Sequence, residues 1–204
     1  PQNSRVEDGR LIIEARAEEL KDRADWGGQE YSSARLVTRD RASWTYGFFE
    51  ARAKLPCGVG TWPAIWTLAQ GPNAPWPDSG EIDIMEHVGL DPGVVHQTVH
   101  TGAFNHVLGT HKSGQVRIKD VCDAFHNYQL HWSPDRIVMG VDGEVVFTFH
   151  KLSSDVKEWP FSRPHYLILN IAIGGTWGGR EGIDEKALPA RMEVDYVRVF
   201  QPKR

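Results

Sequence analysis

Three carboxylates lie within six residues of one another, in segment 80–86, whose sequence is GEIDIME. The hydrophobic residues between Glu81, Asp83 and Glu86 indicate a strand buried on one face. Removing a carboxylate from water costs several kcal/mol unless the charge is paired, so fold stability does not explain such a cluster. Crowding separates the pKa values of buried acids, which leaves one group protonated and another ionised. The segment therefore predicts acid/base chemistry.

Strand geometry adds a requirement to this segment. Side chains alternate between the two faces of a strand, which puts Glu81 and Asp83 on one face and Glu86 on the other. One extra residue, a β-bulge around Ile84 and Met85, would return Glu86 to the face of the other two. We therefore expect three acids along one cleft. The alternative, a surface strand with scattered acids, is disfavoured by the regular hydrophobic residues between them.

Strand patterns cover almost the whole chain, and residues 46–55 are the clearest example. Their predicted inward residues are Gly47, Phe49, Ala51, Ala53 and Leu55, and their predicted outward residues are Glu50, Arg52 and Lys54. Other predicted strands are residues 11–16, 32–39, 64–68, 94–101, 128–132, 137–141, 144–150, 166–173 and 192–200, with a hairpin turn at Asp142-Gly143 and one helical turn at 153–158. This pattern predicts an all-β fold, an antiparallel β-sandwich, as a single domain over residues 1–204.

Composition narrows the classes of partner. The 204 residues can build a core of good size, and the formal net charge is −4. That charge argues against nucleic acid or an anionic membrane as a partner. No apolar run approaches the roughly 20 residues that a membrane-spanning helix needs.

Two cysteines, Cys57 and Cys122, allow one disulfide but do not require it. Closing a loop of this length would stabilise the fold by about 4 kcal/mol in the chain-entropy model. Two free buried thiols are the alternative. The spacing excludes a two-cysteine metal knuckle and a redox motif.

Tryptophan is unusually frequent, with eight residues in 204. Trp62 and Trp66 stand just upstream of the acidic segment, four residues apart, and therefore share a face of an extended strand. Flat apolar rings with one polar edge suit the faces of sugar rings. A place in the core is the alternative for each Trp, and it is weakest for this pair beside the acids. Structural positions are expected for Trp26, Trp44, Trp76 and Trp159.

The acidic segment resembles the signature of glycoside hydrolase family 16 in its bulge-containing form. Residues 46–56, 60–66, 169–177 and 194–200 resemble the laminarinase branch of that family, and the resemblance runs in order from about residue 3 to residue 201. It implies a concanavalin-like jelly roll with a concave substrate cleft. It also implies hydrolysis of internal β-1,3 bonds of β-glucans with retention of configuration.

The resemblance implies a role for each acid. Glu81 would be the nucleophile that forms a covalent glycosyl-enzyme, and Glu86 would protonate the leaving oxygen and then activate water. Asp83 would orient Glu81 and help to keep the proton on Glu86. No cofactor would be required for catalysis.

Substrate contacts are implied in the same way. His100 matches a histidine near the leaving-group side, and Trp62 and Trp66 match the aromatic wall around the reacting sugar. Arg35 and Asn3 match polar contacts to sugars on the non-reducing side. Further cleft candidates are Trp132, Asn170 and Trp177.

One departure from the family concerns its first strand and its calcium ion. Relatives usually carry a strand before the one at Leu11, and we expect this chain to begin after it, which would leave a sheet edge unpaired. Many relatives bind a structural calcium with an acid of that strand and an Asp that matches Asp195. Only Asp195 is present here, which leaves a structural calcium open.

The resemblance further implies a secreted protein that acts on a polysaccharide, and we expect it to be a monomer. Secretion would favour the Cys57–Cys122 disulfide over free thiols. Seven of the nine histidines lie between His87 and His131, but their spacing does not predict a metal site.

Two other functions fit the same fold. A non-catalytic β-glucan-binding module usually lacks one or both glutamates, which this chain retains. Hydrolysis of agar or carrageenan and transglycosylation of xyloglucan are other reactions on this scaffold. Mixed-linkage β-1,3-1,4-glucan is expected as a second substrate of a β-1,3-glucanase.

Overall fold

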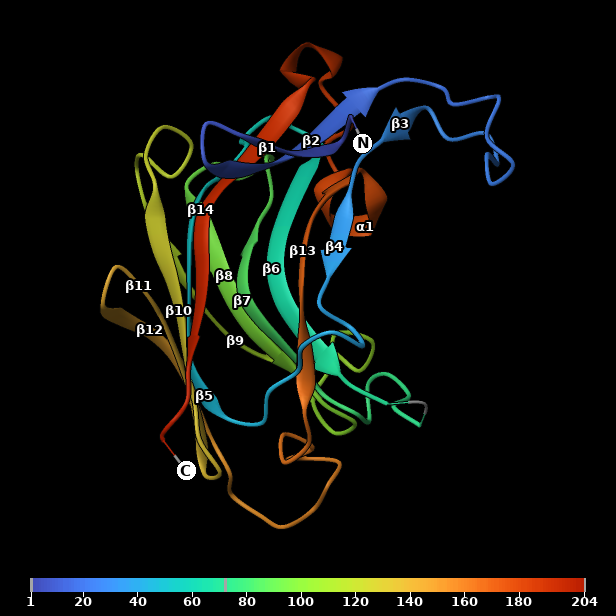
Figure 1. Ribbon diagram of the computed structural model, residues 1–204. Coiled ribbons are helices and arrows are strands. Elements are labelled where there is room, and N and C mark those ends of the chain that lie inside the picture. Colours follow the sequence, from blue (N-terminus) through green and yellow to red (C-terminus); the bar gives the residue numbers. More distant parts are fainter. Residues whose placement is uncertain (1, 72, 204) are drawn as a thin grey trace.

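The computed structural model describes residues 2–71 and 73–203 (Figure 1). Its regular structure is almost entirely β. The strands are β1 (Ser4–Glu7), β2 (Arg10–Ala17), β3 (Tyr31–Ser32), β4 (Arg35–Val37), β5 (Gly47–Lys54), β6 (Thr61–Ala69), β7 (Glu81–His87), β8 (Val94–His100), β9 (Lys112–Arg117), β10 (His126–Trp132), β11 (Arg136–Val141), β12 (Glu144–His150), β13 (His165–Ile173) and β14 (Ala190–Phe200). The helices are α1 (Gly175–Gly178) and the 3₁₀-helix η1 (Glu185–Ala187).

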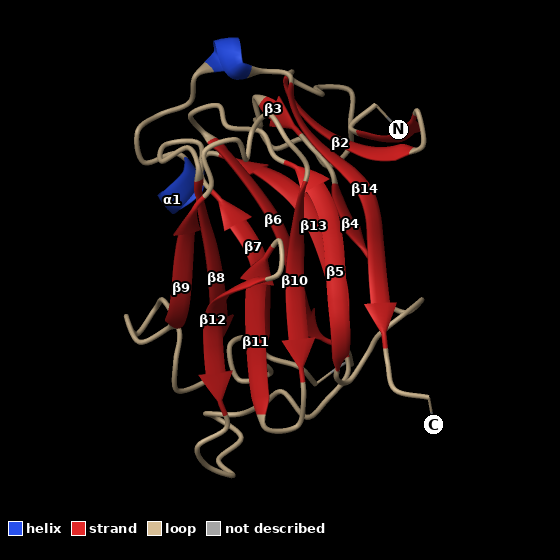
Figure 2. Cartoon of the chain, turned by 90° about the vertical axis from the view of Figure 1, so that its left-hand side faces the viewer, coloured by secondary structure: helices blue, strands red, loops and turns tan. Residues whose placement is uncertain are grey.

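The strands form two antiparallel sheets that pack face to face. The larger sheet has the order β1-β2-β14-β5-β10-β11-β12, and β3 pairs with β2 beside this path. The smaller sheet has the order β4-β13-β6-β7-β8-β9. Figure 2 looks onto the larger sheet and shows β14, β5, β10, β11 and β12 side by side. The predicted antiparallel β-sandwich is confirmed.

The alternating pattern of β5 shows why the two sheets pack together. Its odd-numbered residues from Gly47 to Ala53 are buried, whereas the residues between them are half-buried, as the sequence predicted. Strands β7 and β13 contribute the opposite side of the core, including Ile82, Met85 and Leu167. Burial of apolar surface between the sheets is the main stabilising contribution, at roughly 25 cal/mol per Å².

Three details of the strands differ from the sequence prediction. The short strands β1 and β9 were missed, because neither has a regular hydrophobic period. The predicted strand 32–39 is split between β3 and β4. Residues 153–158 contain the predicted single turn, in which the carbonyl oxygen of Asp155 accepts from the backbone amides of Glu158 and Trp159. Because β1 pairs with β2 over Ser4–Glu7, the edge of β2 that was expected to be unpaired has a partner strand.

A disulfide joins Cys57 to Cys122, which selects one of the two alternatives that the sequence left open. It connects the loop after β5 with the loop before β10, strands that already pair in the larger sheet. Neither helix in the described part of the chain has the length and apolar composition of a membrane-spanning segment.

Candidate active site

Strand β7 contains the predicted β-bulge. Asp83 lies opposite Thr98 of β8 and Glu86 lies opposite His96, so Ile84 and Met85 together oppose one residue of the neighbouring strand. The register with β6 shifts at the same place. The extra residue returns Glu86 to the face of Glu81 and Asp83, while Ile84 and Met85 are buried in the core.

A buried glutamine supports this bulge from the core side. Nε2 of Gln97 donates hydrogen bonds to the carbonyl oxygen of Ile84, at 2.9 Å, and to that of Gly140 in β11, at 3.1 Å. Gln97 is fully buried, and Gly140 lies at a register shift between β11 and β12. The side-chain amide of Gln97 therefore supplies hydrogen bonds to backbone carbonyl oxygens at irregular positions of both sheets. The sequence analysis did not identify this role of Gln97.

The chain immediately before Glu81 is fixed by close packing at Gly80. Gly80 has a positive φ of 86°, a conformation that side chains disfavour. A Cβ atom at this position would lie 2.8 Å from Pro160 Cγ and 2.9 Å from Phe161 Cε1. A larger residue would therefore shift the start of β7, where the first acid stands.

The three acids line one cleft of about 790 Å³ on the outer face of the smaller sheet. Residues of β4, β6, β7 and β13 form its surface, with Trp76 and His106 from neighbouring loops. Neighbouring strands place side chains in rows across it: Arg35 is opposite Asn170, and Glu81 is opposite His100. The cleft therefore crosses the strands of the sheet.

Burial raises the pKa of all three acids. The pKa of Glu81 rises to about 7 through burial, against the hydrogen bonds from Asp83 and Trp76 and the charge of Arg35. The pKa of Glu86 rises to about 7 through burial and the charge of Glu81, against the hydrogen bond from Trp62. Burial, and then the charges of both glutamates, raise the pKa of Asp83 well above its usual range. A protonated Asp83 can therefore donate a hydrogen bond to an ionised Glu81.

Each glutamate accepts a hydrogen bond from a different tryptophan. Trp76 Nε1 donates to Glu81 Oε2 at 2.9 Å, and Trp62 Nε1 donates to Glu86 Oε1 at 3.0 Å. The structure thus corrects the expectation that Trp76 is merely structural. Its position in the loop five residues before Glu81 was the available signal.

Trp66 forms the β13 side of the cleft together with two predicted partners. Its Nε1 donates to Asn170 Oδ1 at 2.7 Å, and the guanidinium of Arg35 lies over its ring, 4.8 Å from the centroid. All three residues line the cleft. The hydrogen bond and the cation–π contact fix the orientation of the ring.

His100 lies on the β8 side of the acids. Its Nε2 is 3.5 Å from Asp83 Oδ2 and 4.0 Å from Glu81 Oε1. Burial, followed by the neighbouring His106 and His111, lowers the pKa of His100 to about 4. The imidazole is therefore neutral at neutral pH. Exposed His106, a cleft residue that the sequence reasoning missed, contacts Trp76 with ring centroids 5.1 Å apart.

Four predicted residues lie outside the cleft lining: His100, described above, and three others. Trp132 is 1% exposed, packs in the core and donates to the carbonyl oxygen of Phe161, so its assignment to the cleft was wrong. Trp177 of α1 stands beside Trp62, with centroids 5.2 Å apart at 76°, and supports the cleft wall from outside the lining. Asn3 lies in an adjoining hollow and donates to the carbonyl oxygen of Glu14 and to Ser32 Oγ.

The carboxylate expected to bind calcium is paired with an arginine. Asp195 accepts a hydrogen bond from Arg52 at 2.7 Å, so a cation already occupies its carboxylate. Among the described residues, the one grouping of three side chains that could hold a metal is Glu81, Asp83 and His100. These side chains belong to the acid cluster, and Asp195 is not among them. Calcium binding stays a prediction.

Known proteins resemble this chain over almost its whole length. The family profile described as glycosyl hydrolases family 16 matches residues 2–198. A beta-glucanase of Rhodothermus marinus is 52% identical over 208 residues, which cover 98% of this chain and 71% of that protein.

Solved structures agree with this sequence similarity. The laminarinase from Rhodothermus marinus has a TM-score of 0.91 at 51% identity, covering 98% of this chain and 80% of that chain. A mutant of SCLam, a non-specific endo-β-1,3(4)-glucanase from family GH16, has a TM-score of 0.96 at 51% identity, covering 98% and 78%. That structure presents 1,3-β-D-cellobiosyl-glucose at its active site. Because the profile and these relatives cover the acid cluster and both sheets together, the chain belongs to glycosyl hydrolases family 16.

Proposed function

We propose that this chain hydrolyses internal β-1,3-glucosidic bonds of β-glucans and retains the configuration of the anomeric carbon. The observation that carries this proposal is the unequal surroundings of two glutamates on one strand. Asp83, Trp76 and Arg35 favour the ionised form of Glu81, whereas the charge of Glu81 favours the protonated form of Glu86. A nucleophile and a general acid are the two groups that a retaining glycosidase needs.

In the first step, Glu86 donates its proton to the glycosidic oxygen while the Glu81 carboxylate attacks the anomeric carbon. The bond between that carbon and the leaving oxygen breaks, and a glycosyl ester of Glu81 forms. In the second step, Glu86 removes a proton from water, whose oxygen attacks the same carbon and releases Glu81. Two inversions at one carbon give net retention.

Asp83 and the tryptophans support both steps through their contacts with the glutamates. A protonated Asp83 holds Glu81 by a hydrogen bond and leaves the total negative charge of the cluster low enough for Glu86 to keep its proton. The indole Trp62 donates to Glu86 and can stack on the reacting sugar. His100 is neutral and lies beside Glu81. Its ring can donate a hydrogen bond to a sugar hydroxyl or accept one from it.

A neutral polysaccharide fits the cleft better than a sulfated one. The lining combines three acids with the rings of Trp62, Trp66 and Trp76. Arg35 is the one Lys or Arg side chain of that lining, among the described residues, and it lies over Trp66. Mixed-linkage β-1,3-1,4-glucan is proposed as a second substrate.

Product analysis tests the proposed function. The protein is incubated separately with laminarin, lichenan and agarose, and products are followed by mass spectrometry and by NMR of the anomeric protons. Short oligosaccharides from laminarin that appear first as β-anomers are the expected result. Laminarin that is bound and never cleaved would instead identify a binding module, and initial α-anomers would exclude the retaining mechanism.

We further propose that the protein works outside the cell as a monomer. A polymeric glucan is too large to cross a membrane unaided, and the disulfide between Cys57 and Cys122 is typical of an oxidising compartment. Light scattering of the purified protein measures its molar mass and tests the monomer.

A further inference from the structure

A second hollow, of about 370 Å³, adjoins the catalytic cleft. Ser33 and Ala34 line both spaces, so the hollow and the cleft meet at these two residues. Its other walls come from the start of the chain and from the loop between β2 and β3. In Figure 1 this loop extends outward from the body of the two sheets.

The hollow lies at the β4 end of the cleft. The catalytic acids stand on β7, and β6, β13 and β4 follow in order toward this edge of the smaller sheet. Ser33 and Ala34 directly precede β4. A polymer that crosses the strands from the acids past Trp66 and Arg35 would therefore leave the sheet here and enter the hollow.

An exposed tryptophan stands in the wall of this hollow. Trp26 is 37% exposed, although tryptophan is normally highly buried. Its Nε1 donates to the carbonyl oxygen of Gln29 at 3.0 Å, and Gln29 Oε1 accepts from the Gly27 amide at 2.6 Å. The polar edge of the ring is thus held by its own loop, which leaves an apolar face for a ligand. Such a face suits the C–H side of a glucose ring.

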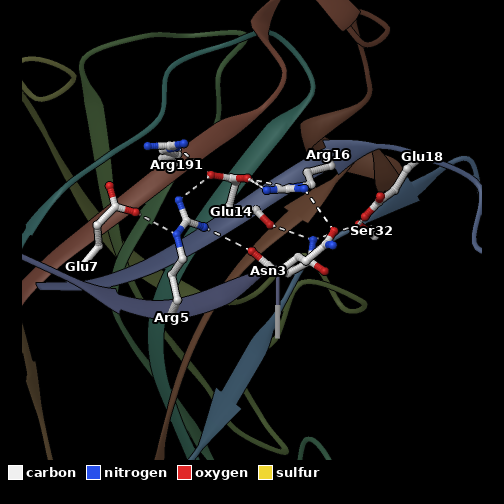
Figure 3. A network of polar contacts seen from close by, with 9 residues as sticks. Asn3, Arg5, Glu7, Glu14, Arg16, Glu18, Ser32 and Arg191 are labelled. Atoms are coloured by element: carbon white, nitrogen blue, oxygen red, sulfur yellow. Dashed lines mark hydrogen bonds and ion pairs between the residues drawn. The ribbon is translucent and has the colours of Figure 1, made fainter.

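Polar side chains at the base of the hollow are fixed in place. Asn3 donates to Ser32 Oγ at 2.8 Å, and Ser32 in turn donates to Glu18 (Figure 3). These three residues line the hollow and tie the β1 segment to the loop. A ligand would therefore meet hydrogen-bonding groups that are already oriented, which lowers the entropic cost of binding.

A buried acid anchors this base to the larger sheet. Glu14 is fully buried and is paired with Arg5 at 3.0 Å, with Arg191 at 2.6 Å and with Arg16 (Figure 3). Burial raises the pKa of Glu14, but the hydrogen bonds from Arg5 and Arg16 outweigh this effect and hold it below its usual range. Since the Glu14 carbonyl oxygen also accepts from Asn3, the hollow rests on a charged network that stays ionised at neutral pH.

We propose that the hollow at Trp26 is a distal binding subsite for the same β-glucan chain, and that it increases the preference for long chains. Trp26 stacks on a glucose unit several sugar units from the scissile bond, next to Asn3, whose contact with sugars the family resemblance already implies. This inference rests on the proposed function. It adds that the preference for long glucan chains depends on the loop between β2 and β3. This loop lies beyond the edge strand of the smaller sheet and does not line the catalytic cleft.

The test compares substrates of two lengths. The kcat/KM for laminarin is divided by the kcat/KM for the shortest β-1,3-oligosaccharide that the parent protein hydrolyses. For Trp26→Ala we expect this ratio to fall roughly five- to tenfold, the loss of one aromatic stacking contact. Trp26→Phe keeps a flat ring and should recover most of the ratio. Phe200→Ala, which removes another exposed aromatic ring outside both spaces, should keep the parental ratio.

An unchanged ratio in Trp26→Ala would overturn the subsite, and so would an equal loss on both substrates. The failure of the proposed function gives a different result, because the parent would then cleave no substrate of either length. In that case calorimetric titration with laminarin still tests whether Trp26 contributes to glucan binding. A roughly five- to tenfold higher Kd for Trp26→Ala supports the subsite, and an equal Kd rejects it.

Discussion

Glu81 and Glu86 have identical side chains but different neighbours, and these neighbours determine which one is the nucleophile and which the general acid. Glu81 receives hydrogen bonds from Trp76 and Asp83 and the field of Arg35, which all favour its charge. Glu86 receives one hydrogen bond, from Trp62, and faces the charge of Glu81. Because burial raises both pKa values, small differences among these contacts decide which group holds the proton near neutral pH.

Removal of either glutamate tests this division of roles. Glu81→Ser and Glu86→Ser should each reduce turnover of laminarin by at least about a hundredfold, since each removes one of the two groups that the reaction needs. Circular dichroism and laminarin binding should match the parent. A variant that retains more than a few per cent of the parental activity would contradict its assignment.

Asp83 should act through Glu81 more than through the substrate. Asp83→Ala removes a donor that lowers the pKa of Glu81, so the acidic limb of the pH–activity profile should move to higher pH and turnover should fall. Asp83→Asn keeps a donor at this position and should move the limb less. Profiles of kcat/KM between pH 4 and 9 provide the measurement. If Asp83→Ala leaves the acidic limb in place, Asp83 has only a structural role.

At the scale of elements, the bulge in β7 depends on its neighbours in both sheets. The Ile84 carbonyl oxygen accepts a hydrogen bond from the side chain of Gln97 in the neighbouring strand β8, and the same amide reaches Gly140 across the sandwich. A buried carbonyl oxygen without a donor costs about 1–3 kcal/mol. The geometry that aligns Glu86 with Glu81 is therefore stabilised from the core.

Replacement of this glutamine should affect stability and catalysis together. Gln97→Leu leaves two buried carbonyl oxygens without their donor, so we expect the free energy of unfolding to fall by about 1–3 kcal/mol. The kcat for laminarin should fall with it, because Glu86 loses its fixed position. Urea titration and initial rates measure the two effects.

The exposed glutamine of β9 provides the matched control for this prediction. Gln115→Leu should change the free energy of unfolding by less than about 0.5 kcal/mol. Parental stability and kcat in Gln97→Leu would show that other contacts hold the bulge.

At the scale of the whole molecule, the acid cluster opposes stability at neutral and alkaline pH. The pKa of Glu86 is near its usual value in the unfolded chain and about 7 in the folded protein. Between these values the folded state binds more protons, so this group stabilises the fold at low pH and the contribution is lost as pH rises toward 7. Buried His87, His100 and His165, whose pKa values are lowered by burial, have the opposite dependence.

A difference between two proteins isolates the contribution of the acid. Glu86→Gln removes the titrating group, so it should be more stable than the parent by on the order of 1–3 kcal/mol above pH 7, and by less at pH 4.5. Urea unfolding at four pH values between 4.5 and 8 measures this difference. A difference that is constant with pH would show that Glu86 titrates alike in the folded and unfolded states.

The disulfide adds stability to the whole chain. Without reductant, mass spectrometry after alkylation should find Cys57 and Cys122 unmodified, and reduction should lower the free energy of unfolding by about 4 kcal/mol. Two alkylated cysteines in the protein before reduction would exclude the bond.

The sequence by itself determined the β-sandwich and the acid cluster with its bulge. Alternation of side chains is a local property of a strand, so residues 46–55 and the spacing of Glu81, Asp83 and Glu86 predict a buried face without knowledge of the partner strands. The same property explains the misses: β1 and β9 have little apolar surface, so no period revealed them.

Only the tertiary structure decided which tryptophans meet the acids. The sequence analysis expected a structural position for Trp76 and a place in the cleft for Trp132, yet a loop brings Trp76 to Glu81, whereas Trp132 fills the core between the sheets. Gln97 and the hollow at Trp26 became visible in the same way. Sheet order and the course of loops are set by contacts between residues far apart in the chain, and a local pattern does not contain those distances.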